Sequence, residues 1–324
     1  MHKVKSTIKQ LGVLLSIPAI VYAVFTVLCP SVFFSLDTVY SILLQSCTVL
    51  LLAWSMTFTQ TAGIMDLSIA AERVLGCIIG VLLCRTMGII GLVTGSMATA
   101  IVVGALKSIL NATLKISSMV ISIAYIYIFG AIGGLIQNNK SMILTSELCL
   151  LGRAPAIWII VLVSGCVIYF LNKYSVLGAN CRALGSNGKL AMDAGINKAA
   201  TEAKAIMISS FFVGISGIVA TSYGAGTAAQ TGLASMNIVF PAVIGFSIGR
   251  LLSKYVDVTL GCISGVVVMC ILATGLTALG IPSQYKDTFT GSFLLILMLM
   301  MSMLEKKRAE AIRRNASQME KEAT

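Results

Sequence analysis

The chain has 324 residues, of which 57% are hydrophobic and 11% are charged, and its mean hydropathy is +0.96. Soluble domains carry about 25% charged residues, so this composition excludes a soluble globular protein and indicates a polytopic membrane protein. The formal net charge of +11 comes from basic residues beside the ends of apolar segments rather than from a basic soluble domain, so we expect no nucleic-acid partner.

Apolar segments separated by short polar connections run through the whole chain. A spanning helix needs about 20 residues, so the pattern predicts an all-α, polytopic membrane protein of about ten transmembrane helices, with a single transmembrane domain over residues 1–324. The spans are expected at 11–29, 39–58, 67–84, 87–106, 118–136, 156–172, 204–222, 237–249, 256–279 and 288–304. The first is long and lacks a small-x-small cleavage site, which favours a retained helix over a signal peptide. The eighth is too short to cross as a regular helix, which favours a broken or re-entrant segment.

The distribution of basic residues predicts the orientation of these spans. With both termini in the cytoplasm, only Arg85, Lys140, Arg153 and Lys286 lie on the outer face, while the other 19 of the 23 Lys and Arg residues lie on the inner face. Cytoplasmic loops carry the excess of basic residues. The asymmetry therefore predicts cytoplasmic termini.

The segment 177–196 is the longest polar interruption, and it is rich in glycine. The same orientation places it in the cytoplasm. A membrane anchor does not need such a loop, whereas a transporter driven by a separate motor protein needs a surface outside the bilayer for the motor to move. We therefore predict a cytoplasmic coupling loop at 177–196. The tail at 305–324 mixes both charge signs and is expected to be a solvated helical extension in the cytoplasm, with contact to anionic membrane lipid as the alternative.

Few polar residues interrupt the spans themselves. Asp66 precedes a span and is expected to cap the helix that follows it. Glu72 and Arg73 are adjacent and are expected to compensate one another, since charges at membrane depth are costly. The uncharged stretch 224–237 on the outer face is either a solute or docking surface or a plain flexible loop. The nine cysteines are scattered and the sole histidine is His2, so we expect neither disulfides nor a metal or other cofactor.

A short internal repeat links the two halves of the chain. The sequence LGCIIGV at 75–81 recurs as LGCISGV at 260–266. Each copy contains GxxxG, which allows helix backbones to approach closely. A duplicated architecture and a chance coincidence both remain open.

Two polar motifs resemble one family of membrane proteins. The stretch 63–70 reads GIMDLSIA, and the stretch 183–196 reads ALGSNGKLAMDAGI. Both are similar to motifs of the permease subunits of ribose-type ABC importers, which carry monosaccharides in bacteria, and the resemblance extends over about 30–303. The resemblance implies coupling to the ATPase through Gly178, Ala183, Gly185, Asn187, Ala191, Gly195 and Ile196. It implies a translocation path or gate at Gly63, Asp66, Leu67, Ser68, Asn237, Phe240 and Phe246.

The stretch 235–250 departs from the family pattern. Acidic positions are neutral here, and the second glycine of a glycine pair is replaced by Phe246. Since a phenylalanine adds bulk where the family has none, we expect close backbone packing to differ there. A partner that retains the full pattern would compensate for these losses, which favours a pair of non-identical permeases over a homodimer.

These patterns predict the transmembrane subunit of an ABC importer for a sugar or similar small polar solute in the bacterial cytoplasmic membrane. The expected partners are an ABC ATPase, an extracytoplasmic solute-binding protein and a second permease subunit. The chain has no Walker A motif, so it is expected to be a transport subunit rather than an enzyme. The alternatives are the same scaffold importing a nucleoside, a furanosyl signal molecule or an amino acid, an ion-coupled secondary transporter, and a non-transporting membrane scaffold.

Overall fold

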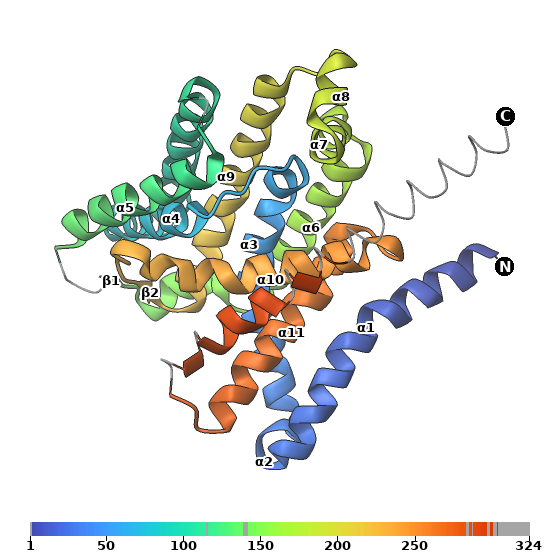
Figure 1. Ribbon diagram of the computed structural model, residues 1–324. Helices are drawn as coiled ribbons and strands as arrows, with labels where there is room; N and C mark the ends of the chain where they lie inside the picture. Colours follow the sequence, from blue (N-terminus) through green and yellow to red (C-terminus); the bar gives the residue numbers. More distant parts are fainter. Residues whose placement is uncertain are drawn as a thin grey trace, which may run out of the picture.

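The computed structural model describes residues 2–114, 116–138, 142–282, 285–286, 288–296, 299–300 and 303, and this part of the chain is almost entirely helical (Figure 1). The predicted tail at 305–324 lies outside the described residues, as does part of the tenth predicted span. The helices are α1 (His2–Leu28), α2 (Pro30–Phe33), α3 (Leu36–Thr61), α4 (Ile69–Leu114), α5 (Ser118–Gln137), α6 (Ala156–Tyr174), α7 (Val176–Ser186), α8 (Gly188–Asp193), α9 (Lys198–Tyr223), α10 (Met236–Leu251) and α11 (Val258–Ala278). Three 3-10 helices, η1 (Ser146–Gly152), η2 (Gly232–Ser235) and η3 (Leu252–Lys254), adjoin them. The strands β1 (Met142–Ile143) and β2 (Gly226–Thr227) pair antiparallel, with Met142 opposite Thr227.

Seven helical stretches in the described part of the chain are long and apolar enough to cross a membrane. The helix α1 adds a shorter apolar stretch at 14–28. Because the backbone of a spanning segment must satisfy its own hydrogen bonds in lipid, apolar segments of this length fold as helices. The all-α, multi-pass prediction is confirmed.

The predicted third and fourth spans form one long element with a sharp reversal. The helix α4 runs for 46 residues, but Gly88 has φ 63° and ψ −148°, which is not helical. The two arms fold back on one another, since a Cβ placed on Gly95 would lie 2.9 Å from the Cα of Gly80. Gly80 belongs to the first copy of the repeated motif.

The second copy of the motif makes an equivalent contact. A Cβ on Gly261 in α11 would lie 2.8 Å from the Cα of Gly249 in α10. In both copies, therefore, the glycines bring two helix backbones together as the GxxxG pattern predicts.

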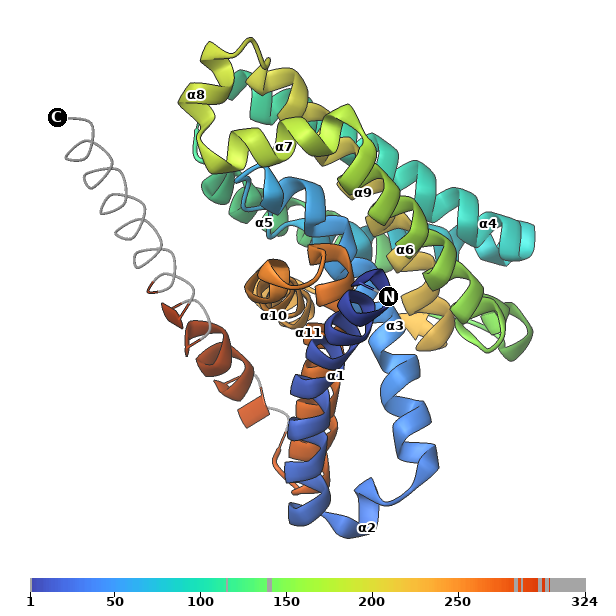
Figure 2. The same cartoon turned by 90° about the vertical axis from the view of Figure 1, so that its right-hand side faces the viewer.

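The helix α3 is the centre of the fold. It packs against α9, α10 and α11, while α1 lies beside α11 (Figure 2). The indole Nε1 of Trp54 donates a 2.8 Å hydrogen bond to the backbone oxygen of Thr259 in α11, and Ser216 of α9 donates to the backbone oxygen of Thr48 at 3.4 Å. These hydrogen bonds join α3 to α11 and to α9. The ends of α3, α6, α7 and α10 meet at the region described next.

The short eighth span is lengthened at both ends. The helix α10 has 16 residues, about 24 Å of α-helix, which is shorter than the roughly 30 Å hydrocarbon core. The turns η2 and η3 extend it to a stretch of 23 residues over Gly232–Lys254. Pro241 lies inside α10, where it removes one backbone hydrogen bond.

Candidate functional site: the coupling helices and the α3–α4 linker

The predicted coupling loop is helical rather than irregular. Ser175 caps α7 by accepting a 3.0 Å hydrogen bond from the backbone N–H of Gly178, and Asn187 caps α8 by accepting one of 3.1 Å from Leu190. Gly195 ends α8 with φ 88°, and the N–H of Ile196 bonds to the oxygen of Ala191 at 3.0 Å. The glycine and asparagine positions of this segment therefore start and stop two short helices.

The remaining predicted coupling residues set how α7 and α8 pack. Gly178 and Ala191 are buried, whereas Ala183 is half-buried. A Cβ on Gly178 would meet the backbone of Asn172 at the end of α6, with Leu171 O 2.8 Å away. A larger residue at 178 therefore cannot fit without moving α7 away from α6.

Gly185 joins α7 to the end of α3. A Cβ on Gly185 would collide with the backbone oxygen of Thr61 and lie 3.1 Å from its carbonyl carbon. Thr61 is the last residue of α3, and Gly63 follows in a left-handed conformation with φ 82°. The N–H of Ile64 bonds to the oxygen of Thr59 at 2.8 Å and that of Gly63 to Gln60 at 3.2 Å, which is a Schellman ending. The α7 backbone at Gly185 therefore lies directly against the end of α3 from which the α3–α4 linker starts.

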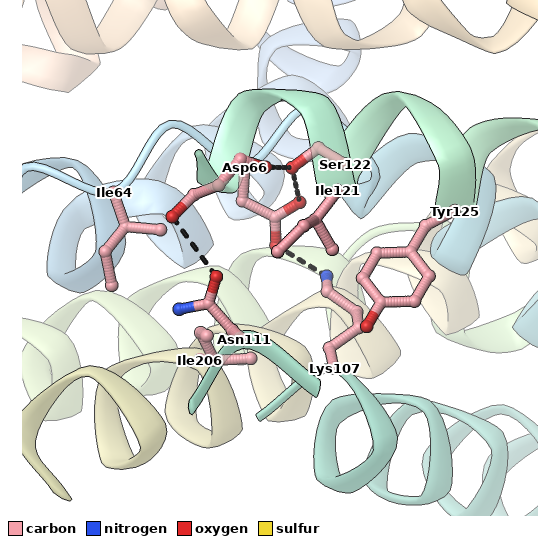
Figure 3. Close-up of a pocket in the computed structure, with 9 residues that line it drawn as sticks. Ile64, Asp66, Lys107, Asn111, Ile121, Ser122, Tyr125 and Ile206 are labelled. Carbon is pink, nitrogen blue, oxygen red and sulfur yellow. Dashed lines mark hydrogen bonds and ion pairs between the residues drawn. The ribbon is translucent and has the colours of Figure 1, made fainter. Parts of the chain in front are cut away.

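Asp66 lies in this linker and is held by three elements (Figure 3). Its carboxylate accepts hydrogen bonds from the Ser68 N–H at 2.9 Å, the Ser68 hydroxyl at 2.6 Å and the Ser122 hydroxyl of α5 at 3.3 Å. Lys107 Nζ of α4 lies 2.5 Å from the other carboxylate oxygen. Asp66 thus satisfies the backbone where α4 begins, as the capping prediction expects, and also ties α4 to α5.

The partner of Glu72 corrects the sequence-based interpretation. Glu72 Oε2 lies 2.8 Å from Lys107 Nζ, so it is paired with Lys107 and not with Arg73. Successive residues of a helix point about 100° apart and do not face each other. Asp66, Glu72 and Lys107 are each at most 4% exposed. One lysine therefore bridges two buried carboxylates, and this ion network joins the two arms of α4 to the linker.

The ion network borders a small cavity of about 10 Å³. Tyr125 and Ile121 of α5 and Ile206 of α9 close it beside Lys107, as Figure 3 shows. Asn111, near the end of α4, accepts a 3.2 Å hydrogen bond from the Ser118 hydroxyl at the start of α5. This cavity is too small for a sugar, and the network beside it ties α4, α5 and the linker together.

A second, larger cavity of about 660 Å³ lies next to the coupling helices. It brings together Gly63 and Phe246, predicted for the path, with Gly185, predicted for coupling. Its wall is made of Gln60, Thr61, Gly63, Asn172, Lys173, Arg182, Gly185, Ser186, Phe246, Arg250, Ser253, Asp257 and Val258. Asp257 also caps α11, because its carboxylate accepts a 2.9 Å hydrogen bond from the Thr259 N–H.

The other predicted path residues are divided between separate places. Leu67 and Ser68 are buried beside Asp66. Asn237 and Phe240 lie toward the opposite end of α10 from Phe246, exposed and half-buried respectively, with Asn237 about 13 Å along the helix from Phe246 at about 1.5 Å per residue. The described structure therefore does not gather these seven residues into one site.

Close packing of α10 on α11 occurs beside Phe246. Gly245 and Gly249 of α10 face α11, where a Cβ on Gly265 would lie 2.9 Å from the Cα of Gly245. Phe246 borders the large cavity instead. Its aromatic ring forms part of the cavity wall. Gly245 and Gly249, on the face of α10 toward α11, make the close contact between the two helices.

A family model described as "Branched-chain amino acid transport system / permease component" matches residues 38–299. The chain belongs to this family. The L-arabinose ABC transporter permease protein AraH of Azospirillum brasilense is 23% identical over 258 residues, covering 76% of this chain and 75% of the relative. The probable ABC transporter permease protein YphD of Escherichia coli is 24% identical over 317 residues, covering 94% and 93%. The xylose transport system permease protein XylH of Escherichia coli is 26% identical over 139 residues, covering 43% and 35%.

The family resemblance seen in the sequence is thus confirmed, and the chain is a permease subunit of an ABC transporter rather than an enzyme. With its apolar helices, it is a multi-pass protein of the inner membrane. No solved structure gives a significant match to the chain.

Sequence reasoning missed the pairing of Lys107 with Glu72 and Asp66. The signal was present, since a lysine within an apolar span needs a compensating charge and the two nearest spans supply only a few carboxylates. The missing information was the reversal at Gly88, which folds the arms of α4 together and brings positions 35 residues apart into contact.

Proposed function

We propose that this chain forms half of the transmembrane path of an ABC importer for a sugar or a similar small polar solute. The sugar class is supported by the relatives, of which one is an L-arabinose transporter permease and another a xylose transport system permease. The departures at 235–250 leave the individual sugar open. A nucleoside, a furanosyl signal molecule or an amino acid on the same scaffold is the alternative.

The observation that carries the mechanism is the backbone contact between Gly185 of α7 and Thr61 of α3. In the proposal, α7 and α8 seat in a cytoplasmic ATPase subunit, and ATP-driven closure of two such subunits displaces them. Because α7 has no side-chain layer between itself and the α3–α4 linker, the displacement passes to Gly63 and Asp66. The Asp66–Lys107–Glu72 network then moves α4 and α5 with the linker.

The remaining partners follow from this arrangement. A solute-binding protein delivers the solute to the outer face, and a second permease completes the path. We favour a non-identical second permease, because two copies of this chain would both carry Phe246 and both lack the acidic positions of the family pattern. The asymmetry of basic residues supports a cytoplasmic position for both termini, the coupling helices and the tail at 305–324.

The test is to purify the chain with its ATPase and solute-binding protein and to measure ATP hydrolysis with L-arabinose, D-xylose, D-ribose, a nucleoside and a branched-chain amino acid. We expect at least one sugar to stimulate hydrolysis and the amino acid to have no effect. Stimulation by the nucleoside or the amino acid alone would overturn the sugar assignment. Co-expression of two differently tagged copies tests the pairing, because an active complex with both tags and no second permease contradicts a hetero-pair.

A further inference from the structure

The cavity of about 660 Å³ has a wall of positive charge. Lys173 at the end of α6, Arg182 in α7 and Arg250 at the end of α10 line it, whereas Asp257 is the one acidic residue in its wall as described. These four side chains come from four different elements, which converge only in the folded protein. The excess of positive charge attracts anions.

Two of these basic residues form no close ion pair with a described carboxylate, and Asp257 of the same wall attracts Lys173 only at longer range. Among the described residues, neither Lys173 nor Arg182 takes part in an ion pair. Lys173 donates to the hydroxyl of Tyr169 at 2.7 Å, and Arg182 donates to the backbone oxygen of Asn172. Both hydrogen-bond acceptors are neutral, and both basic residues are exposed.

The rest of the wall suits a hydroxylated molecule. Gln60, Ser186 and Ser253 add amide and hydroxyl groups that hydrogen-bond to hydroxyls, and Phe246 adds an aromatic surface. Asn172 is 5% exposed, and its Oδ1 accepts no hydrogen bond in the described structure, so the wall also contains an unsatisfied acceptor. Ligand sites for small molecules have volumes of about 300–1,000 Å³, which includes this cavity.

We propose that this cavity binds a small phosphate ester from the cytoplasm, with the chemistry of a phosphorylated sugar. The arginines hold the phosphate, since guanidinium groups match its oxygens in bidentate geometry, and the neutral groups and Asp257 hold the hydroxyls. The occupant touches α7, α10 and the start of α11 together. It therefore fixes the spacing between the coupling helix and α10 and slows transport.

The regulatory consequence rests on the proposed import of a sugar, whereas the binding site does not. A kinase that phosphorylates the imported sugar would produce a ligand of this class. Accumulation of that product would then reduce further uptake through this cavity.

The test uses the permease–ATPase complex in lipid nanodiscs without nucleotide, and isothermal titration with D-ribose 5-phosphate, D-ribose and inorganic phosphate. We expect the ester to bind at least tenfold more tightly than either comparison ligand. Arg182→Gln and Arg250→Gln each lower the affinity for the ester about tenfold, as loss of a charge-assisted hydrogen bond predicts. Lys204→Gln is the control, because Lys204 is exposed and does not line the cavity.

Several results would overturn the inference. These are absence of ester binding to the wild-type complex, wild-type affinity in both arginine variants, or an equal loss in Lys204→Gln. Equal binding of inorganic phosphate overturns the ester assignment. Gel filtration identifies a variant that fails to assemble, in which case the other arginine variant decides. The ester should also lower solute-stimulated ATP hydrolysis at saturation. If binding is seen without a sugar-stimulated activity, the proposed function fails and the site stands.

Discussion

Replacement of Lys107 by methionine should destabilise the protein strongly. The side chain of Lys107 is 3% exposed and bridges Asp66 at 2.5 Å and Glu72 at 2.8 Å. Methionine has a similar length but no charge, so the variant leaves two carboxylates buried without their cation. Removal of one partner from a buried ion pair costs about 3–5 kcal/mol, which corresponds to more than a hundredfold in the unfolding equilibrium.

The matched control is Lys198→Met. Lys198 pairs with Glu202 at 3.8 Å, and its side chain is 54% exposed, so the same substitution there should cost about 0–1 kcal/mol. Both variants are unfolded with SDS in mixed micelles while tryptophan fluorescence is followed. If Lys107→Met is no less stable than Lys198→Met, the buried ion network does not hold the helices together and the reasoning is wrong.

A second substitution identifies which of the two carboxylates, Asp66 or Glu72, is destabilised more by the loss of Lys107. Asp66 keeps its hydrogen bonds from Ser68 and Ser122 when Lys107 is removed, whereas Glu72 loses its 2.8 Å bond to the lysine. Glu72→Gln should therefore restore more stability to Lys107→Met than Asp66→Asn does. Equal or opposite rescue would show that the serine hydroxyls do not stabilise the Asp66 carboxylate.

Three further outcomes are expected. Gly185→Ala should abolish solute-stimulated ATP hydrolysis with normal membrane insertion, because a Cβ at 185 meets the Thr61 backbone. Gly188→Ala should retain the stimulated hydrolysis, because a Cβ at 188 meets nothing within 4 Å. Full stimulation in Gly185→Ala refutes the proposed transmission. Cys181 is buried, and burial raises the pKa of its thiol to about 11, so maleimide labelling of Cys181 should be slow at pH 7, whereas a cysteine placed at exposed Ser186 should react at that pH. Fast labelling of Cys181 at pH 7 contradicts its burial. A reporter fused after Asn315 should be active only in its cytoplasmic form, and a periplasm-active fusion would mean an odd number of spans.

The all-α, multi-pass architecture followed from the sequence alone, whereas seven stretches of the described residues are long and apolar enough to span a membrane, against about ten predicted. Whether a segment is apolar for about 20 residues is a local property, and a backbone in lipid must bond to itself, so composition along the chain was enough. The residues Asn187 and Gly195, which the sequence singled out for coupling, act in the structure on neighbouring backbone groups at the ends of α8. These interactions join residues within a few positions of each other, and motif reading located them even though it described the segment as a loop.

The partners of the charged residues were decided only by the tertiary structure. The sequence placed Glu72 beside Arg73, but the reversal at Gly88 brings Lys107 to Glu72 instead. Likewise, nothing local indicates that Gly185 meets the Thr61 backbone or that Arg182 and Arg250 line one cavity. Such contacts depend on how the helices fold back and cross, and that is set by packing between segments far apart in the chain rather than by the hydrophobic pattern of any one of them.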